Sequence, residues 1–330
     1  MGSIEMHKKH VLTLSGGPFQ SSPYLQELMC YVGTELVFEN ASAMLTKTKG
    51  IEINAKQIER VCHHYGERIE EIQAKSIASG AAPANFKADF QNSYYAMLDG
   101  AMLLTREEKW KELKLGRIFK GSDIININKN RNQITDSLYV AHLGTHTDFL
   151  QKFEHYLDQL RLLIFIADGA PWIWKWIEAN YPESIQILDF FHAKEHLYGF
   201  AKIYFSDLTE YTLWAKTQSD LLLNDQIKQV IENIEQLPKT RKPETEQSRK
   251  ALINYYNTNN KRMMYKTFRE QGLLIGSGPI ESAHRNVIQQ RLKLSGQRWT
   301  QKGLQQMANL RVVYKSNKWV EIVDYIDKAA

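Results

Sequence analysis

Apolar residues recur at helical spacing over the first part of the chain. The pattern predicts three helices, over Tyr24–Leu36, over Phe38–Lys47 and from Asn54 onward, with a turn at Gly50. Asn54, followed three positions later by Gln57, is typical of a helix start at which side chains cap the free N–H groups. An apolar stripe then marks the buried face of the third helix: Ile58, Val61, Cys62 and Tyr65.

Two helices joined across a short turn that contains Gly also suggest a helix-turn-helix. The exposed face of the third helix carries side chains that suit phosphates and base edges, namely Lys56, Gln57, Arg60 and His63. A helical packing module explains the same spacing equally well, so both interpretations stay open. His63 and His64 are adjacent and point apart on a helix, so we do not expect them to bind one metal ion together.

After about residue 85 the hydrophobic pattern changes to that of strands. Three β-rich runs predict a meander, with a turn at Asn128–Gln133: Ser93–Leu98, Arg117–Ile127 and Ile134–Leu143. Helical and continuous apolar patterns then alternate, over Thr147–Arg161, Leu162–Ala167, Pro171–Asn180 and Ser184–Leu188. This alternation predicts buried parallel strands added to the meander, in the order β-β-β-α-β-α-β-α.

No strand pattern follows His192. Residues 196–272 are predicted to be helical with a break at Pro238–Pro243, and Gly278 before Pro279 opens a further helix because Pro is favoured at the first helical position. The pattern therefore divides the chain into three regions. Residues 1–80 form an N-terminal helical region, residues 86–195 and 273–330 form an α/β core in two segments, and residues 196–272 form an all-α insertion.

Composition restricts the class of protein. The chain has 330 residues, of which 43% are hydrophobic and 24% charged, ordinary values for a globular protein that exclude a disordered or collagen-like chain. No apolar run is long enough to span a bilayer, and Met1–His10 lacks the apolar core of a signal peptide, so we expect a cytoplasmic protein. Cys30 and Cys62 have no C-x-x-C partner and are expected to be reduced core thiols.

The net charge of +5 is concentrated near the C-terminus. The stretch Ser282–Val320 has no Asp or Glu and eight basic residues: Arg285, Arg291, Lys293, Arg298, Lys302, Arg311, Lys315 and Lys318. A solvated helix face usually mixes both signs, so contact with nucleic acid is the favoured interpretation of this stretch. Trp299 lies among these residues and suits either a core anchor or a DNA contact.

Three carboxylates occupy positions where chemistry is expected. Asp99 and Asp168 each follow a predicted strand, and open α/β sheets bind ligands at the carboxyl ends of their strands. Because Asp-Gly is a common hairpin turn, a turn is the alternative for Asp99. Glu281 lies in the first turn of the helix that begins at Pro279, where the helix dipole also favours an acid. Beside a basic surface, three convergent carboxylates suggest two hard metal ions that clamp a scissile phosphate.

Four ordered motifs give the chain a resemblance to a known family. They are Leu98-Asp99-Gly100 with Trp110–Gly116, Ala167–Ala170, Leu188–His192 and Gly276–Ser282. Together they resemble the DDE transposases of bacterial insertion sequences, and within them the Mutator-like group, which has an RNase H-like catalytic core. The resemblance extends from about Leu25 to Arg311.

The resemblance implies an α/β fold with an RNase H-like core, an all-α insertion and an N-terminal helix-turn-helix-like region. It implies that Asp99, Asp168 and Glu281 are the catalytic triad and bind two Mg²⁺ ions, for which Mn²⁺ can substitute. Asp189 and His192 correspond to the D-x-x-H pair of the family. The implied activity is cleavage and strand transfer of double-stranded DNA at insertion-sequence ends, by a nucleoid-associated homodimer or larger assembly.

Two other functions remain open. A DNA-binding regulator descended from a transposase binds DNA without cutting it, although the intact acid triad argues against this. The segment His192–His196 also matches H-x-x-E-H, the pattern with which a zinc hydrolase places two His ligands on one helix face. Such a short pattern often arises by chance, and a zinc hydrolase leaves the basic stretch without a role.

Overall fold

The computed structural model describes residues 18–83, 86, 88–128 and 131–329. The N-terminal stretch Met1–His10 and residues 129 and 130 of the predicted turn lie outside the described residues. The chain divides into two compact units. Unit 1 consists of Met1–Asn92, Leu98–Arg161 and Ile280–Ala330, and unit 2 consists of Ser93–Met97 and Leu162–Pro279.

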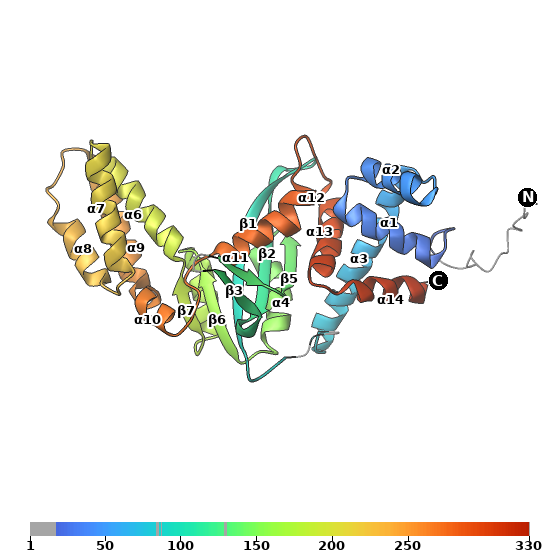
Figure 1. Ribbon diagram of the computed structural model, residues 1–330, viewed down its shortest axis with the longest axis horizontal. Coiled ribbons are helices and arrows are strands. Elements are labelled where there is room, and N and C mark those ends of the chain that lie inside the picture. Colours follow the sequence, from blue (N-terminus) through green and yellow to red (C-terminus); the bar gives the residue numbers. More distant parts are fainter. Residues whose placement is uncertain (1–17, 84–85, 87, 129–130, 330) are drawn as a thin grey trace, which may run out of the picture. The chain divides into compact units, whose positions relative to one another are not determined.

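Unit 1 begins with three helices, as the sequence predicts (Figure 1). They are α1 at Pro23–Glu35, α2 at Phe38–Lys49 and α3 at Ala55–Ser79. Gly50 ends α2 in the left-handed region with φ of 66°, which glycine adopts without strain. The side chain of Asn54 caps α3, because it accepts a hydrogen bond of 2.8 Å from the N–H of Gln57. These local signals explain why the helix starts are predictable.

The apolar stripe of α3 is in the core, where Ile58, Val61, Cys62 and Tyr65 are at most 1% exposed. Helix α3 packs against α1, α2 and the later helix α13 (Gln301–Lys315), and α14 (Trp319–Ala329) packs against α1. Cys30 and Cys62 are free and buried, which confirms that they are core thiols. Burial raises the pKa of the Cys30 thiol well above its ordinary value.

The first strand is longer than the sequence predicts. β1 runs over Ser93–Thr105 and continues through a turn at residues 106–108 into β2 (Lys109–Lys120). The alternative of a hairpin turn at Asp99 is therefore wrong, and the positive φ of 60° at Lys109 marks the place where the chain reverses. β2 pairs antiparallel with β5 (Leu138–Leu143).

The other two predicted runs of the meander are each divided. The run predicted over Arg117–Ile127 covers the end of β2, a 3-10 turn at Gly121–Asp123 and most of β3 (Ile124–Asn128). The run predicted over Ile134–Leu143 covers the last residue of β4 (Arg131–Ile134) and all of β5. β3 and β4 form a separate antiparallel pair, and four of the five β3 residues are exposed. Helix α4 (His146–Leu157) packs against β2 and β5.

Unit 2 contains the parallel strands that the sequence predicts. β6 (Leu162–Ala167) pairs in parallel with the first residues of β1, and β7 (Ile185–Leu188) pairs in parallel with β6. Helix α5 (Pro171–Asn180) makes the crossover between β6 and β7 that parallel neighbours require. The strand order is β5-β2-β1-β6-β7, so the protein has a mixed α/β fold with a five-stranded mixed sheet.

The remainder of unit 2 is helical (Figure 1). Its helices are α6 (Phe190–Tyr204), α7 (Leu208–Leu222), α8 (Ile227–Gln236), α9 (Pro243–Asn259) and α10 (Tyr265–Glu270), with a 3-10 turn at Asn260–Arg262. No residue from 196 to 272, all of which are described, lies in a strand, and the predicted break is the loop between α8 and α9. Among the described residues, no helix has the length and apolar character needed to cross a membrane.

Candidate active site

The parallel pairing of β1 and β6 fixes where two predicted catalytic acids stand along their strands. Met97 and Ile166 are the last paired residues, and Asp99 and Asp168 each follow two positions later. The pairing of the two strands ends at Met97 and Ile166. β6 ends at Ala167 whereas β1 continues, so Asp168 follows a strand and Asp99 lies within one.

Within unit 1, the carboxylate of Asp99 faces His284. The Nε2 atom of His284 lies 3.3 Å from Oδ2 of Asp99, and the side chains are 7% and 48% exposed, respectively. Neither ring nitrogen of His284 has a hydrogen-bond partner among the described residues. The two groups are therefore close but do not form a hydrogen bond. Oδ1 of Asp99 accepts a hydrogen bond of 2.7 Å from the N–H of Gly100. Asp99 thus presents an exposed carboxylate whose orientation is fixed on one side.

Glu281 and His284 lie on one helical run whose pitch changes. The run consists of α11 (Gly278–Ala283), a π-helical segment at His284–Gln289 and α12 (Gln290–Leu292). This confirms the helix predicted to open at Gly278-Pro279. Residues three apart on a helix share a face, so Glu281, which is exposed, lies on the same side of the run as His284. Short π-helical segments occur frequently at functional sites.

Within unit 2, Asp168 is held by the turn that enters α5. Its Oδ1 accepts a hydrogen bond of 3.0 Å from the N–H of Ala170, and its backbone carbonyl accepts one of 2.8 Å from the indole N–H of Trp174. Tyr255 of α9 lies directly against Gly169, where an added Cβ would lie 2.2 Å from the tyrosine ring. The residue after Asp168 must therefore be small, and the carboxylate is positioned by its own loop.

Asp189 and His192 form a buried hydrogen-bonded pair in unit 2. Oδ2 of Asp189, which is fully buried, lies 2.6 Å from Nδ1 of His192, and Oδ1 accepts hydrogen bonds from the N–H groups of Phe191 and Ser277. Burial alone would raise the pKa of Asp189, but these hydrogen bonds lower it below its ordinary value. The hydrogen bond to Asp189, with the nearby charge of Asp168, raises the pKa of His192 to about 9. The predicted D-x-x-H pair therefore exists as a carboxylate–imidazolium pair at neutral pH.

Three residues near these groups were not singled out from the sequence. His284 is signalled only by its spacing of three residues from Glu281, Ser277 lies within the motif Gly276–Ser282 without an assigned role, and Tyr255 carries no local signal. Tyr255 is far from Asp168 in sequence, and Ser277 is far from Asp189, to which it forms hydrogen bonds through its backbone N–H and its side chain. Such contacts depend on how helices pack, so they can be found only in the structure.

The three predicted catalytic acids are of the residue type that binds hard cations. Asp99, Asp168 and Glu281 offer carboxylate oxygens, which Mg²⁺ prefers as ligands. Oδ1 of each aspartate accepts a hydrogen bond from a nearby backbone N–H, that of Gly100 for Asp99 and that of Ala170 for Asp168. In the part of the chain that the structure describes, no three His, Cys, Asp or Glu side chains are gathered closely enough to hold a metal ion.

The zinc-binding interpretation of His192, Glu195 and His196 fits the structure poorly. A zinc ligand must be an unprotonated imidazole. The hydrogen bond to Asp189 raises the pKa of His192 to about 9, so a zinc ion would have to displace a proton from this side chain. His196 instead stacks beside Tyr255, with 4.3 Å between ring centroids.

Two of the predicted DNA-contacting residues lie in the core. Arg291 is 0% exposed, and Trp299 is 7% exposed and donates its indole N–H to the carbonyl of Leu292 at 3.0 Å. Arg311 of the same basic stretch is also 0% exposed and forms an ion pair of 2.8 Å with Glu35. The stretch Ser282–Val320 is therefore not one continuous basic surface. Some of its positive side chains are buried in the core and others are exposed.

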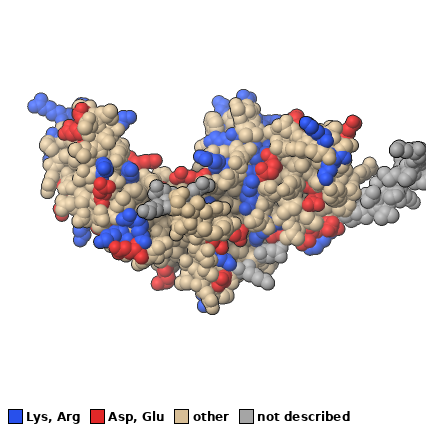
Figure 2. Space-filling model, viewed as in Figure 1, with Lys and Arg blue, Asp and Glu red and all other residues tan. Residues whose placement is uncertain are grey.

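Other basic residues are exposed but paired. Lys302 lies 2.5 Å from Glu67, and Lys56 of the predicted DNA-contacting face lies 2.8 Å from Glu59. Within Ser282–Val320, the basic residues that are exposed and form no ion pair with described residues are Arg285, Lys293 and Arg298. Figure 2 shows Lys and Arg interspersed with Asp and Glu over the visible face. Gln57 is half-buried and Arg60 is exposed on α3.

The comparison with known proteins gives one match. Residues 93–328 match the model of an uncharacterised protein family, UPF0236. The match includes every strand of the five-stranded sheet, the helical part of unit 2 and the helical run that carries Glu281. No curated protein matches the chain.

Proposed function

This chain belongs to the uncharacterised protein family UPF0236, which is associated with transposase-like proteins, and we propose that it is a DDE transposase of the Mutator-like type. It cleaves double-stranded DNA at the ends of an insertion sequence and transfers the cut strand to target DNA. In this proposal the five-stranded mixed sheet is an RNase H-like core, the helices of residues 196–272 are the all-α insertion, and the helices before residue 80 contribute a helix-turn-helix-like DNA contact.

The register of β1 and β6 is the observation that supports the proposal most. Two carboxylates follow the paired residues Met97 and Ile166 at the same distance along adjacent parallel strands. Phosphoryl transfer with two metal ions needs carboxylates that can bridge cations about 3.5–4 Å apart. The equal spacing of the two acids from this pair favours the proposal that both serve the same pair of cations.

Each polar residue then has a defined role. Asp99, Asp168 and Glu281 would hold two Mg²⁺ ions, which when bound supply the positive charge that the attacking and leaving oxygens need. The N–H of Gly100 orients the Asp99 carboxylate, and His284 lies 3.3 Å from its other oxygen. His192, protonated and fixed by Asp189, donates a hydrogen bond to a phosphate oxygen. Two DNA ends must be handled together, so the working form is a homodimer or larger assembly.

Replacing Asp168 by Asn tests the proposal. We expect Asp168→Asn to abolish Mg²⁺-dependent nicking of a duplex that contains the insertion-sequence end, because the neutral amide is a poor Mg²⁺ ligand. Binding of the same duplex should be unchanged or slightly tighter, since one negative charge is removed. Asp220→Asn, an exposed acid on α7 of the same unit, is the matched control and should cut like the parent.

The same assay separates the proposal from its alternatives. A DNA-binding regulator retains the duplex in a gel-shift experiment but never nicks it, with or without Asp168→Asn. A zinc hydrolase does not respond to the duplex at all. Nicking by Asp168→Asn at the parental rate in Mg²⁺ would contradict the assignment of this residue.

A further inference from the structure

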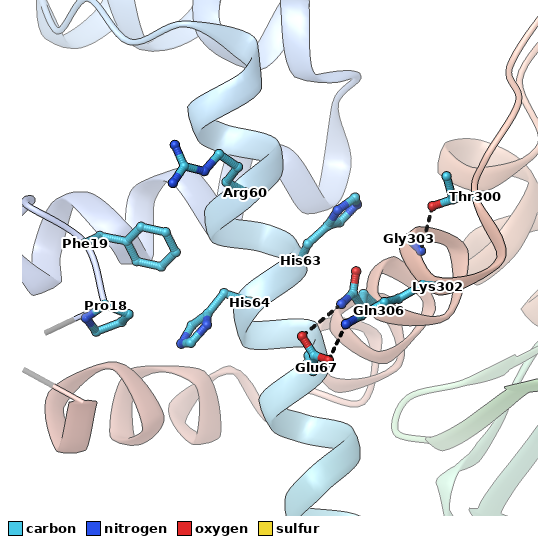
Figure 3. Close-up of a pocket in the computed structure, with 10 residues that line it drawn as sticks. All are labelled: Pro18, Phe19, Arg60, His63, His64, Glu67, Thr300, Lys302, Gly303 and Gln306. Carbon is cyan, nitrogen blue, oxygen red and sulfur yellow. Dashed lines mark hydrogen bonds and ion pairs between the residues drawn. The ribbon is translucent and has the colours of Figure 1, made fainter.

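His63 of α3 lines two cavities of unit 1. The first, of about 450 Å³, is drawn in Figure 3, where His64 points toward Phe19 and His63 points toward Gly303. The carboxylate of Glu67 in this cavity is satisfied by the protein itself, by an ion pair with Lys302 and a hydrogen bond from Gln306 (Figure 3). This cavity thus holds a carboxylate that already has its partners.

The second cavity, of about 410 Å³, has the buried Arg291 in its wall. Nε of Arg291 donates to the carbonyl of Gly33 at 3.0 Å, but Nη1 and Nη2 have no hydrogen-bond partner among the described residues. The guanidinium carbon lies 4.8 Å from the ring centroid of Phe38 and 5.1 Å from that of Trp299. These cation–π contacts offset part of the cost of burying the charge, but they leave the terminal N–H groups unsatisfied.

Further unsatisfied and positive groups surround Arg291. Nε2 of His63 is buried and has no hydrogen-bond partner among the described residues, and Arg106 and Arg298 line the cavity with exposed side chains. Glu39 and Glu59 also line it, but Glu59 is paired with Lys56 at 2.8 Å. Burial lowers the pKa of Arg291 only to about 10, so this residue remains charged at neutral pH. The cavity therefore has an excess of positive charge that is not neutralised by the protein.

Hydrogen bonds between separate segments build the walls of this cavity. The N–H of Arg106, in the turn after β1, donates to the carbonyl of Trp299 at 2.8 Å, and Thr105 forms an isolated parallel bridge with Trp299. The indole N–H of Trp299 donates in turn to Leu292 at 3.0 Å. The positions of the arginines are thus fixed by the fold.

We propose that this cavity binds a phosphate group, with Arg291 as its buried anchor and Arg106 and Arg298 as its rim. A guanidinium group is suited to phosphate, because it presents parallel N–H donors to two phosphate oxygens. The volume lies in the range of about 300–1,000 Å³ that ligand pockets usually have. The phosphate comes either from a free phosphate compound or from a nucleic-acid strand, and only the second source rests on the proposed function.

Binding of inorganic phosphate to the full chain tests the site without DNA cleavage. We expect phosphate to raise the melting temperature of the parent and to give a measurable affinity by titration calorimetry. The double variant Arg106→Ala/Arg298→Ala should bind phosphate at least about tenfold more weakly, since it loses two charge-assisted contacts. Lys47→Ala, an exposed basic residue of α2 in the same unit that does not line the cavity, is the control and should bind like the parent.

Arg291→Ala leaves a void in the core and is at risk of not folding, so Arg291→Lys tests the anchor. It keeps the charge but cannot form the parallel pair of bonds, and we expect it to weaken phosphate binding in a protein that still melts cooperatively. The proposal is wrong if millimolar phosphate leaves the parent unchanged, or if Lys47→Ala loses as much affinity as the double variant. It is equally wrong if Arg291→Lys binds phosphate like the parent.

A single-stranded oligonucleotide then distinguishes the two sources of phosphate. If the double variant binds the oligonucleotide more weakly than Lys47→Ala does, the site holds a strand phosphate. If the two variants bind the oligonucleotide equally and differ only toward inorganic phosphate, the site holds a free phosphate compound. Both results support the site, and neither depends on whether the protein nicks DNA.

Discussion

Asp189 shows how one buried carboxylate can be stabilised by its surroundings. It is 0% exposed, yet both of its oxygens have partners, namely the imidazole of His192 and the N–H groups of Phe191 and Ser277. A buried carboxylate without such partners would be strongly destabilising. The pair is therefore part of the stability of unit 2 as well as a candidate for chemistry.

The pair predicts a particular dependence of stability on pH. Because the pKa of His192 is raised from 6.5 to about 9, its contribution is complete below pH 6.5 and is lost as the pH rises through 9. Because the pKa of Asp189 is lowered, its contribution is lost on the acid side, below its ordinary value of 3.8. We expect His192→Gln to lower the melting temperature by a few degrees at pH 6 and by almost nothing above pH 9.

His196→Gln, on the same helix, is the control for this titration. Burial lowers the pKa of His196, which is the opposite sign, so its replacement should not reduce stability at pH 6. Asp168 and Glu195 also raise the pKa of His192, so the protein should be titrated without added metal ions. A deficit of His192→Gln that is the same at pH 6 and above pH 9 would show that the pair acts only by packing.

At the scale of elements, the contact between α3 and α13 depends on a glycine. A Cβ added at Gly66 of α3 would lie 2.2 Å from the backbone carbonyl oxygen of Gln306 on α13. The carbonyl of Gly66 also accepts a hydrogen bond of 2.9 Å from the side chain of Asn309 on α13. The two helix backbones therefore approach each other as closely as only glycine permits.

Gly66→Ala should accordingly destabilise unit 1, by about 1–3 kcal/mol from overpacking. The sign of the change in the free energy of unfolding is informative. Where there is room for a Cβ, replacing glycine by alanine in a helix stabilises it by about 1 kcal/mol. Gly199→Ala, in the interior of α6 with nothing within 4 Å of an added Cβ, is the control and should stabilise the protein. Urea denaturation of both variants measures the difference, and a stabilising Gly66→Ala would disprove the close approach.

For the whole molecule, the placement of charge matters more than its total. Of the eight basic residues between Ser282 and Val320, two are fully buried and others pair with acids of distant segments, as Lys302 does with Glu67 and Lys315 with Glu35. Arg285, Lys293 and Arg298 remain exposed and without an ion pair to described residues. Electrostatic attraction of DNA by this stretch therefore depends on fewer charges than the sequence suggests.

This arrangement predicts a modest dependence of DNA binding on salt. Each phosphate contact contributes about −0.9 to the slope of log K against log salt concentration. Lys293→Ala should therefore make the slope shallower by about 1. Lys302→Ala removes the same charge from a residue that is already paired with Glu67, and it should change the slope less. Equal changes for the two variants would show that the ion pair opens when DNA binds.

The sequence by itself determined the features that depend on short stretches of chain. The cap at Asn54, the left-handed turn at Gly50, the apolar strand Leu162–Ala167 and the helix after Pro171 are all predictable, because the residues that cause each feature are neighbours. For the same reason, the D-x-x-H spacing predicts the contact between Asp189 and His192, which lie three residues apart on one helix turn.

Only the tertiary structure decided the features that join distant stretches. β1 continues past Asp99 because it has β2 beside it, and a strand ends where its pairing ends rather than at a suitable dipeptide. His284 faces Asp99, and Arg291 enters the core to reach Gly33, although both belong to a stretch that the sequence presents as a basic surface. Burial and pairing are properties of packed elements, and a charge count along the chain contains no information about which side chains the packing turns inward.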